Sequence, residues 1–527
     1  MGIPSYYKRL TTNIKGVVNQ RCNIPINWLW MDFNCAIYHC LRNPDIPPYP
    51  GDDKKDEWEA VFIQTISRYC LDIVKRVCPT DGVFIAIDGI VPMAKMKQQR
   101  MRRFKSVWLR QNGLDESSTP GPKWDTNAIT PGTRFMDKLH KQMTKLVKSK
   151  KGWSLSSSFE AGEGEHKIME KWRTGAHSGS YAVYGLDADL IVLSLLNKRY
   201  HPVWLFREEI ENGEIQKDSD GTTQFCWFDI GKLEDTLFGT NKNTRCLLDY
   251  CFAMSFLGND FIPSPIGFKI REDGHEAMLE ILREMWKTPG GSIYLIESDG
   301  KTISQSGLLH LIGRFAESEE RRIKNYAIRK VKQKAGLAVP DICVGNPDWP
   351  IYACEESVLL HKNHTTDFYS LVVNWQHIYL TRWFKNGNIY EICAAYIHSL
   401  QWNWSYYIGD CINLCYNWYY PWNLPPLWSW LLPHCTAGIL IIPRTAFVRK
   451  EAIKPEDHLS LVLPLESWSL LHGSKNYQLP RIAPWMFPSS YEFSSVGKRW
   501  FWETEAEIPI VSPGELKKIL NSNINEQ

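Results

Sequence analysis

Residues 1 to about 315 alternate short apolar tracts with amphipathic stretches at helical spacing. Such apolar tracts are typical of buried strands, and helices between them connect the strands into a largely parallel sheet. Residues 56–78 show the helical pattern well, with one apolar stripe made of Trp58, Val61, Phe62, Thr65, Ile66 and Tyr69. We therefore predict an α/β fold for this region, with a mainly parallel central sheet and flanking helices.

The remaining polar and charged stretches predict further elements. Residues 94–110 and 136–150 have the pattern of two long basic helices. Between them, residues 112–132 are rich in Gly, Pro, Ser and Thr, which predicts an exposed loop. Residues 208–223 have the composition of a surface hairpin or loop. Residues 316–334 are densely charged, and we interpret them as a solvated helix that links two regions.

A change in composition separates the last third of the chain from the rest. Of the 23 tryptophans, 13 lie beyond residue 345, and 527 residues are too many for one ordinary core. We predict a first region at residues 1–315, a charged linker at 316–345, and a second region at 346–527. The second region should be mostly helical and Trp-rich, and it should pack on the first.

Composition favours a globular protein and argues against several other classes. Hydrophobic residues make up 44% of the chain, and the net charge is only +3, so a nucleic-acid surface must be local. No apolar run approaches the roughly 20 residues of a membrane helix. The N-terminus resembles no signal peptide or myristoylation site, because Tyr6 stands where Ser or Thr is needed. The 14 cysteines include no Cys-x-x-Cys pair, which favours buried, reduced thiols over a zinc site.

Acidic residues follow the ends of the apolar tracts, which is the strongest chemical signal in the sequence. Three tracts run directly into Asp32, Asp88 and Asp187. The motifs Gly-Glu-Gly-Glu-His, Leu-Asp-Ala-Asp and Leu-Gly-Asn-Asp-Phe add four more carboxylates, namely Glu163, Glu165, Asp189 and Asp260. Because ligands bind beyond the carboxyl ends of parallel strands, we expect these side chains to converge there.

Each carboxylate alone has a plainer explanation, since Asp commonly caps a helix and Glu favours a helix N-terminus. Seven independent caps in these contexts are the poorer explanation. Seven carboxylates in one pocket need cations beside them to stay ionised. Hard oxygen ligands without clustered His or Cys favour Mg²⁺ or Mn²⁺ over zinc, and we interpret His166 as a structural partner of Glu165. The sequence therefore predicts a phosphodiester hydrolase with two metal ions.

A basic segment, residues 95–105, begins seven residues after Asp88. By itself it could be a solvated helix face or a nuclear-import patch. One face offers ammonium, amide and guanidinium donors at helical spacing, from Lys95, Gln99, Arg102 and Arg103. Because guanidinium groups match phosphate oxygens, we predict that this face binds a terminal phosphate beside the metal centre. The tryptophans of the second region are mostly packing residues, although one or two could stack on bases.

Taken together, these motifs resemble the Xrn-type 5′→3′ exoribonucleases over nearly the whole chain. The resemblance rests on Met-Gly-Ile-Pro at the start, on residues 87–104, 162–169, 184–191 and 256–263, and on residues 400–402, 418–421 and 501–503. It implies a core like that of PIN and flap nucleases, with the family's second conserved region packed over it. It also implies Mg²⁺-dependent, processive release of nucleoside 5′-monophosphates from single-stranded RNA, in mRNA turnover.

The resemblance also assigns roles to residues of this chain. The metal ligands would be Asp32, Asp88, Glu163, Glu165, Asp187, Asp189 and Asp260. The pocket for the 5′-monophosphate would be Lys95, Gln99, Arg102 and Arg103, and it would exclude caps and triphosphates. In the family, a His six residues after the first Asp stacks on the terminal base with a Trp. Here that position is Tyr38, with His39 adjacent, and the Trp is Trp418 by the Trp-Tyr-Tyr-Pro match.

The chain departs from the family in its C-terminal part. It lacks the further C-terminal domains of the large cytoplasmic members and the zinc knuckle of the nuclear members. Protein partners are therefore left open, and we expect a monomer in the cytoplasm, without excluding the nucleus. Two alternative functions remain, a DNA flap endonuclease and a non-catalytic RNA-binding scaffold. Residues 262–268 lack the glycine run of flap endonucleases, and the presence of every predicted ligand argues against a scaffold.

Overall fold

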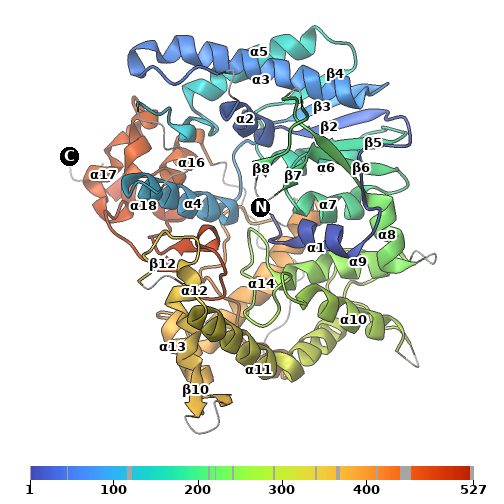
Figure 1. The fold of residues 1–527 in the computed structure, drawn as a ribbon, viewed down its shortest axis with the longest axis vertical. Helices are drawn as coiled ribbons and strands as arrows, with labels where there is room; N and C mark the ends of the chain where they lie inside the picture. Colours follow the sequence, from blue (N-terminus) through green and yellow to red (C-terminus); the bar gives the residue numbers. More distant parts are fainter. Residues whose placement is uncertain are drawn as a thin grey trace.

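The computed structural model describes the chain except residues 1, 44–45, 115–120, 212–213, 220, 240–242, 289–290, 339–340, 364–367, 411–413, 439–452 and 523–527. A large sheet with helices on both faces occupies one half of the molecule, and a mostly helical region fills the other half (Figure 1). Among the described residues, none of the helices combines the length and apolar character that crossing a membrane requires.

The secondary structure alternates strands and helices up to α9 and is mainly helical afterwards. The strands are β1 (Val18–Asn19), β2 (Trp28–Asp32), β3 (Gly82–Ala86), β4 (Trp153–Ser156), β5 (Tyr181–Tyr184), β6 (Val203–Glu208), β7 (Ile210–Glu211), β8 (Glu214–Ile215), β9 (Phe225–Asp229), β10 (Leu360–Asn363), β11 (Phe368–Leu371), β12 (Phe493–Ser494) and β13 (Glu505–Ala506). The helices before the second region are α1 (Tyr6–Asn13), α2 (Asn34–Leu41), α3 (Lys55–Val77), α4 (Met93–Gln111), α5 (Arg134–Lys148), α6 (Gly164–Thr174), α7 (Asp189–Asn197), α8 (Ile230–Phe238), α9 (Thr244–Ala253) and α10 (Gly274–Trp286). They are followed by α11 (Gln305–Ala335), α12 (Trp349–Ala353), α13 (Trp375–Trp383), α14 (Ile389–Ile408), α15 (Trp428–Thr436), α16 (Pro455–Val462), α17 (Leu479–Ile482) and α18 (Pro513–Ser522).

The central sheet has the strand order β1-β9-β6-β5-β2-β3-β4. Strands β6, β5, β2, β3 and β4 run parallel, while β9 is antiparallel to both β6 and β1. The chain enters the parallel set at β2, moves outward through β3 and β4, and then returns to add β5 and β6 on the other side. This reversal makes the β2–β5 junction a switch point, where open α/β sheets form ligand sites. The predicted α/β fold with a mainly parallel sheet is confirmed.

Successive residues of the strands supply two separate cores. Leu29 and Met31 of β2 pack in the core formed with α2, α3 and α5, whereas Trp30 packs in the core formed with α6 to α9. Strands that are buried on both faces read as continuous apolar runs, which explains the sequence pattern. Helix α3 lies where the pattern predicts it, although Val61 of the stripe is 37% exposed.

The second region shares the larger of these cores with the first. Trp402 and Trp404 of α14 and Trp428 of α15 are almost fully buried, in one apolar cluster with residues of α9, α10 and α11. The ring of Trp404 lies 5.7 Å from Phe252 of α9, at an interplanar angle of 74°. The predicted helical, Trp-rich region packed on the first is therefore present.

Helix α4 lies between the sheet and the C-terminal helices α16 to α18 (Figure 1). Its residue Arg100 is buried and donates to the backbone oxygens of Leu461, Met486 and Pro509. Two lysines of α4 make similar contacts: Lys97 donates to the Tyr420 oxygen at 2.8 Å, and Lys105 to the oxygens of Trp502 and Thr504 at 2.7 Å each.

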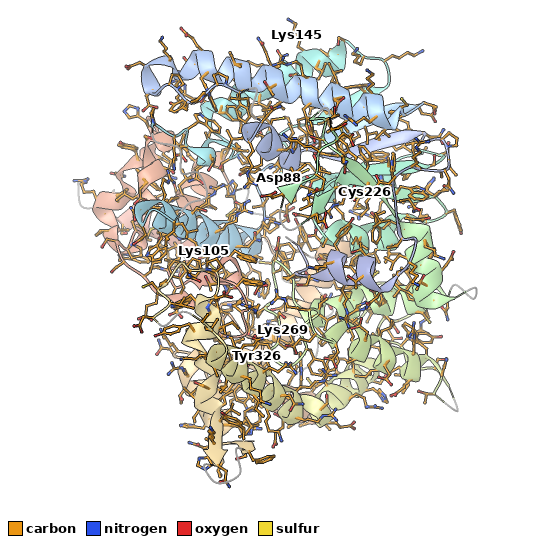
Figure 2. The ribbon with its side chains drawn as sticks, in the orientation of Figure 1. Asp88, Lys105, Lys145, Cys226, Lys269 and Tyr326 are labelled. Carbon is orange, nitrogen blue, oxygen red and sulfur yellow. The ribbon has the colours of Figure 1, made fainter. Side chains whose placement is uncertain are left out.

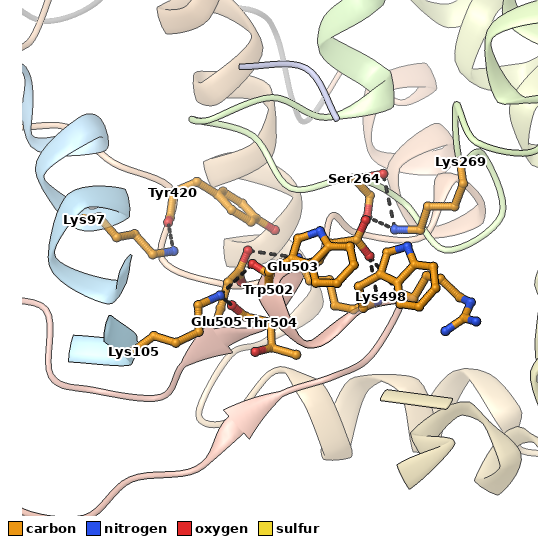
Figure 3. Close-up of polar contacts among 12 residues, drawn as sticks. Lys97, Lys105, Ser264, Lys269, Tyr420, Lys498, Trp502, Glu503, Thr504 and Glu505 are labelled. Atoms are coloured by element: carbon orange, nitrogen blue, oxygen red, sulfur yellow. Dashed lines mark hydrogen bonds and ion pairs between the residues drawn. The ribbon is translucent and has the colours of Figure 1, made fainter. Parts of the chain in front are cut away.

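These two lysines lie near two others, and the four form what we call the lysine cluster: Lys97, Lys105, Lys269 and Lys498 (Figure 3). Lys269 donates to the backbone oxygen and the hydroxyl of Ser264, both at 3.3 Å. The Lys498 Nζ lies 3.0 Å from a carboxylate oxygen of Glu505. The cluster therefore joins the first region to the end of the second.

Two sequence predictions need correction. Residues 112–132 are not an exposed loop throughout, because Trp124 packs on Phe62 and Phe135 and Thr130 is fully buried; residues 115–120 lie outside the described part. The charged segment 316–334 belongs to helix α11 and is not solvated on all sides, since Glu319 and Lys330 are buried. Composition alone gave no sign of the partners that bury these side chains.

The hairpin predicted at residues 208–223 is present as β7 and β8.

Candidate metal centre

The predicted carboxylates lie at the carboxyl ends of the parallel strands. Asp32 is the last residue of β2, and Asp88 and Asp187 follow β3 and β5 by two and three residues. Asp189 begins α7, and Glu163 and Glu165 stand at the start of α6. Figure 2 shows Asp88 near the centre of the molecule. Parallel strands thus deliver side chains from distant parts of the sequence to one place.

Close approaches show that these side chains share one pocket. Carboxylate oxygens of Glu165, Asp187 and Asp189 lie within 4.8 Å of one another. Asp32 packs so closely on α6 that a Cβ built on Gly164 would lie 2.5 Å from its Oδ1. Gly2 has φ +43°, and a Cβ there would lie 2.5 Å from the Oδ1 of Asp189. Glycine at both positions therefore lets the backbone reach the carboxylates.

Asp88 is held by two groups of the surrounding backbone and side chains. Its Oδ1 accepts from the backbone N–H of Gly164 at 2.7 Å, and its Oδ2 accepts from Asn34 Nδ2 at 2.8 Å. The Asn34 Oδ1 in turn accepts from the Asp88 N–H at 3.0 Å. Asn34 was not among the predicted site residues, although it lies two positions after Asp32.

Lys95 lies among the carboxylates. Its Nζ is 2.5 Å from Glu163 Oε2 and 2.8 Å from Asp260 Oδ2. This ammonium brings Asp260, from the segment after α9, next to the start of α6. Helical spacing grouped Lys95 with Gln99, Arg102 and Arg103, but its contacts are with acidic groups.

The electrostatics show more negative charge than Lys95 can balance. Burial, followed by the charges of Asp88, Asp187 and Asp189, raises the pKa of Asp32 well above its usual range. Burial and neighbouring carboxylates likewise raise the pKa of Glu165, and that of Asp189 to about 7. Burial acts in the same direction on Asp187, but nearby positive charges including Lys95 outweigh it and lower its pKa to about 2. Closely packed carboxylates resist ionising together unless cations are present.

Two buried carboxylate oxygens of this site, Glu165 Oε1 and Asp189 Oδ1, accept no hydrogen bond from the part of the chain that the structure describes. A buried carboxylate oxygen without a partner is costly, so such groups are expected to face an ion or an ordered ligand. The possible metal-ligand atoms around them are carboxylate oxygens, apart from a ring nitrogen of His166. This nitrogen lies within 4.8 Å of carboxylate oxygens of Glu163 and Glu165. Oxygen donors are the ligands that Mg²⁺ and Mn²⁺ prefer, so the residues present fit a divalent metal ion.

Helix α14 of the second region contributes a residue that sequence reasoning missed. The hydroxyl of Tyr406 donates to Glu163 Oε1 at 2.6 Å, from a side chain that is 5% exposed. The His166 ring stacks on Tyr406 with 3.7 Å between ring centroids, which supports the structural role predicted for this His. The only sequence signal was general: a Tyr in a buried helix needs a partner for its hydroxyl.

The other three residues of the predicted phosphate pocket lie on the same helix as Lys95 but have other surroundings. Gln99 is buried and its Oε1 lies 3.3 Å from His458 Nε2, while Arg103 Nη2 donates to Thr130 Oγ1 at 2.8 Å. Arg103 Nη1 is buried without a partner, so one guanidinium edge remains free for an acceptor. Arg102 is exposed beside it. His458 and Thr130 come from α16 and from the segment before α5, which spacing within α4 could not indicate.

The predicted stacking residues are placed differently from one another. Tyr38 is 37% exposed, and its hydroxyl lies near enough to Arg103 to act on the pKa of that guanidinium. His39 instead stacks on Tyr69 at 4.4 Å, with its Nδ1 3.9 Å from Glu208. Tyr38 is thus the aromatic group on the pocket side. Trp418 is half-buried and lies 5.3 Å from Trp402; within the described residues no ring contact joins it to Tyr38.

The fold and the site define a class of protein. A parallel α/β sheet that gathers carboxylates at its switch point, with arginines beside them, is typical of metal-dependent phosphodiester hydrolases. Comparison with known proteins gives the same class: residues 1–209 match the family described as "XRN 5'-3' exonuclease N-terminus".

Curated relatives extend the match over the rest of the chain. The "5'-3' exoribonuclease 2" of Schizosaccharomyces pombe is 31% identical over 367 residues, covering 56% of this chain and 36% of that protein. The "5'-3' exoribonuclease 1" of Homo sapiens is 24% identical over 608 residues, covering 99% of this chain and 34% of that protein. The chain is therefore similar to the Xrn-type 5′→3′ exonucleases, and residues 1–209 match the N-terminal region of that family. It spans about a third of the length of these two relatives.

Proposed function

We propose that this chain is a processive, Mg²⁺-dependent 5′→3′ exoribonuclease. Its substrate is single-stranded RNA with a 5′-monophosphate, and its products are nucleoside 5′-monophosphates. The observation that carries the proposal is the meeting of seven carboxylates, two of their oxygens without partners, around Lys95. The names of the relatives, which are 5'-3' exoribonucleases, support the same activity. We place the enzyme in cytoplasmic mRNA turnover.

The residues of the chain divide the work between holding ions and holding RNA. Asp32, Asp88, Glu163, Glu165, Asp187, Asp189 and Asp260 would hold two Mg²⁺ ions, which when bound supply an activated water and neutralise the leaving oxygen. Lys95 keeps Glu163 and Asp260 in place and balances part of their charge. Asn34 and the N–H of Gly164 orient Asp88. Such supporting contacts commonly set metal affinity.

The 5′-phosphate is bound by residues of α4, namely Gln99, Arg102 and Arg103. Arg103 offers a buried N–H edge without a protein acceptor, and Thr130 fixes the orientation of its guanidinium. Burial lowers the pKa of Arg103 to about 10, so it stays charged at neutral pH, and within the described residues it forms no ion pair with a carboxylate. The aromatic face of Tyr38 beside it can cover the first base.

The experiment compares RNAs that differ only at the 5′ end. Purified protein with Mg²⁺ is incubated with 5′-monophosphate, 5′-triphosphate and 5′-hydroxyl forms of one labelled RNA, and the products are identified. We expect nucleoside 5′-monophosphates from the first RNA and slow or no release from the others. Products that begin inside the RNA, or faster cleavage of a DNA flap, would contradict the proposal.

The phosphate pocket has its own test. Arg102→Ala should remove the preference for 5′-monophosphate over 5′-hydroxyl RNA, because a guanidinium–phosphate contact is lost. Arg110→Ala, an exposed arginine near the end of the same helix, serves as the matched control. An unchanged preference in Arg102→Ala would place the terminal phosphate elsewhere.

A further inference from the structure

A polar groove with a volume of about 290 Å³ lies between α11 and the loop that precedes α10. Its main lining residues are Glu272, Asp273, Arg321, Arg322, Asn325 and Arg329. The last four share one side of α11, since their spacing of one, three and four residues keeps them on a common face. None of these residues belongs to the carboxylate site or to its arginine pocket.

The groove already holds an arginine in the geometry that a phosphate requires. Arg322 Nη1 and Nη2 contact the two carboxylate oxygens of Asp273 at 2.8 and 3.2 Å, which is a bidentate fork. The Arg322 Nε is buried and has no partner among the described residues, and the guanidinium carbon lies 4.5 Å from the Phe268 ring centre. The carboxylate of Asp273 is 61% exposed, so a phosphate can replace it at little cost.

The charge of the groove is positive. Arg329 is paired with Glu272 and Arg322 with Asp273, but Arg321 is exposed and has no ion-pair partner in the described part of the chain. The same half of α11, residues 321–334, has no acidic residue and carries Arg321, Arg322, Lys324, Arg329, Lys332 and Lys334, besides Lys330, which is buried and paired with Glu356. This local excess gives an anionic polymer a reason to bind here although the whole chain carries only +3.

The groove is also within reach of the carboxylate site. Gly267, which lines the groove, follows Asp260 by seven residues on the same segment, so the two lie at most about 25 Å apart. Figure 2 shows Lys269 and Tyr326, from the loop and from α11, on the same side of Asp88. A stacked strand advances about 3.4 Å per nucleotide, so roughly eight nucleotides cover this distance.

We propose that this arginine groove binds backbone phosphates of single-stranded RNA, on the 3′ side of the nucleotides held at the carboxylate site. The proposal rests on the proposed exoribonuclease function and adds a second contact to it. The groove binds long substrates and leaves short ones unaffected. It therefore contributes to processivity, because RNA remains attached at the groove while each product nucleotide leaves.

The test uses RNA length as an internal control. Binding is measured in protein carrying Asp187→Ala, with 5′-monophosphate RNAs of about 4 and about 16 nucleotides. Adding Arg321→Ala should weaken binding of the longer RNA about fivefold and reduce the slope of log affinity against log salt by about 0.7. The shorter RNA should bind as before. Arg314→Ala, on the same helix but paired with Glu284 and Glu317, is the matched control and should change neither.

Each outcome decides for or against the groove. The proposal is overturned if Arg321→Ala weakens binding of both RNA lengths equally, or of neither. It is also overturned if the groove binds inorganic phosphate or polyglutamate but not the longer RNA. Full-length protein without Asp187→Ala is assayed in parallel with Mg²⁺. If it releases no nucleoside 5′-monophosphates from either RNA, the proposed function fails, whatever the binding shows. If it digests both and Arg321→Ala shortens no processive runs, only the groove proposal fails.

Discussion

Two clusters of like charge lie along helix α4, and their polar atoms are satisfied in different ways. Lys95 reaches into the carboxylates, where Glu165 Oε1 and Asp189 Oδ1 have no hydrogen-bond partner. Lys97 and Lys105 reach into the lysine cluster, where backbone carbonyls accept from the ammonium groups (Figure 3). Buried like charge alone therefore does not mark a functional site. The two clusters differ because unsatisfied carboxylate oxygens lie beside like charges in the first, whereas the ammonium groups of Lys97 and Lys105 have acceptors in the second.

The pKa values of the two clusters shift in opposite directions for one reason. Burial disfavours the charged form, so it raises the pKa of Asp189 to about 7 and lowers those of Lys97 and Lys105 to about 8. A bound divalent ion would reduce the repulsion among the carboxylates of the first cluster. In the lysine cluster the protein itself stabilises the buried charge, because Lys105 donates to the backbone oxygens of Trp502 and Thr504.

The largest expected effect comes from the carboxylates. Asp187→Ala should lower hydrolysis by about three orders of magnitude, because a metal-stabilised transition state is worth several kcal/mol. Binding of RNA should remain largely intact, as measured by fluorescence anisotropy in the absence of turnover. Asp249→Asn is the control, since Asp249 is a fully buried carboxylate that accepts from the backbone N–H groups of Leu295 and Ile296. It should cost stability and leave the rate per folded molecule unchanged; undiminished hydrolysis by Asp187→Ala would remove Asp187 from the mechanism.

Tyr406→Phe should have the next largest effect, on metal affinity. The variant keeps the ring that stacks on His166 but loses the hydroxyl that donates to Glu163. Loss of such a supporting hydrogen bond typically lowers metal affinity about 10- to 100-fold. The measurement is calorimetric titration with Mn²⁺, together with the Mg²⁺ concentration needed for half-maximal activity.

A control for Tyr406 is available about three turns away on the same helix. Tyr396 is equally buried on α14, far from Glu163, and its hydroxyl has no partner. Tyr396→Phe should leave the metal titration unchanged. Equal metal affinity in both variants would show that Tyr406 only fills space.

The sequence predicted those features of the two clusters that depend on the local pattern of residues. Apolar tracts that end in Asp place Asp32, Asp88 and Asp187 at one sheet edge, because parallel strands point the same way. Helical spacing placed Lys95 and Arg103 on α4 correctly. It could not indicate that Lys95 faces Glu163 and Asp260, because a helix face has no fixed partner until the fold is known.

Long-range contacts explain the remaining errors. Tyr406 reaches Glu163 across 243 residues, and it is one of many aromatic residues in its helix. Thr130 and His458 complete the surroundings of Arg103 and Gln99 from segments that composition suggested were a loop or left unassigned. Polar side chains of this kind reveal their roles through partners rather than through spacing.

A smaller effect is expected from the lysine cluster. Lys105→Met keeps an apolar stem of similar length but leaves the carbonyl oxygens of Trp502 and Thr504 without a donor. We expect a loss of about 1–2 kcal/mol in the free energy of unfolding. Urea denaturation measures it, and Lys141→Met on the exposed side of α5 is the control. Hydrolysis per folded molecule should not change; a large drop would mean that the lysine cluster takes part in the reaction.

The pH dependence of stability sharpens the same comparison. Burial lowers the pKa of Lys105 in the folded protein to about 8, whereas the pKa of a lysine in the unfolded chain is about 10.4. Between these values the unfolded state binds more protons, so stability should rise with pH, by at most about 1.4 kcal/mol per unit for each such lysine. Lys105→Met lacks one of these groups, so the stability gap between wild type and variant should widen from pH 8 to 10. If the difference in the free energy of unfolding stays constant or narrows, the ammonium of Lys105 is not desolvated. Its contacts with the carbonyl oxygens would then be exposed surface contacts.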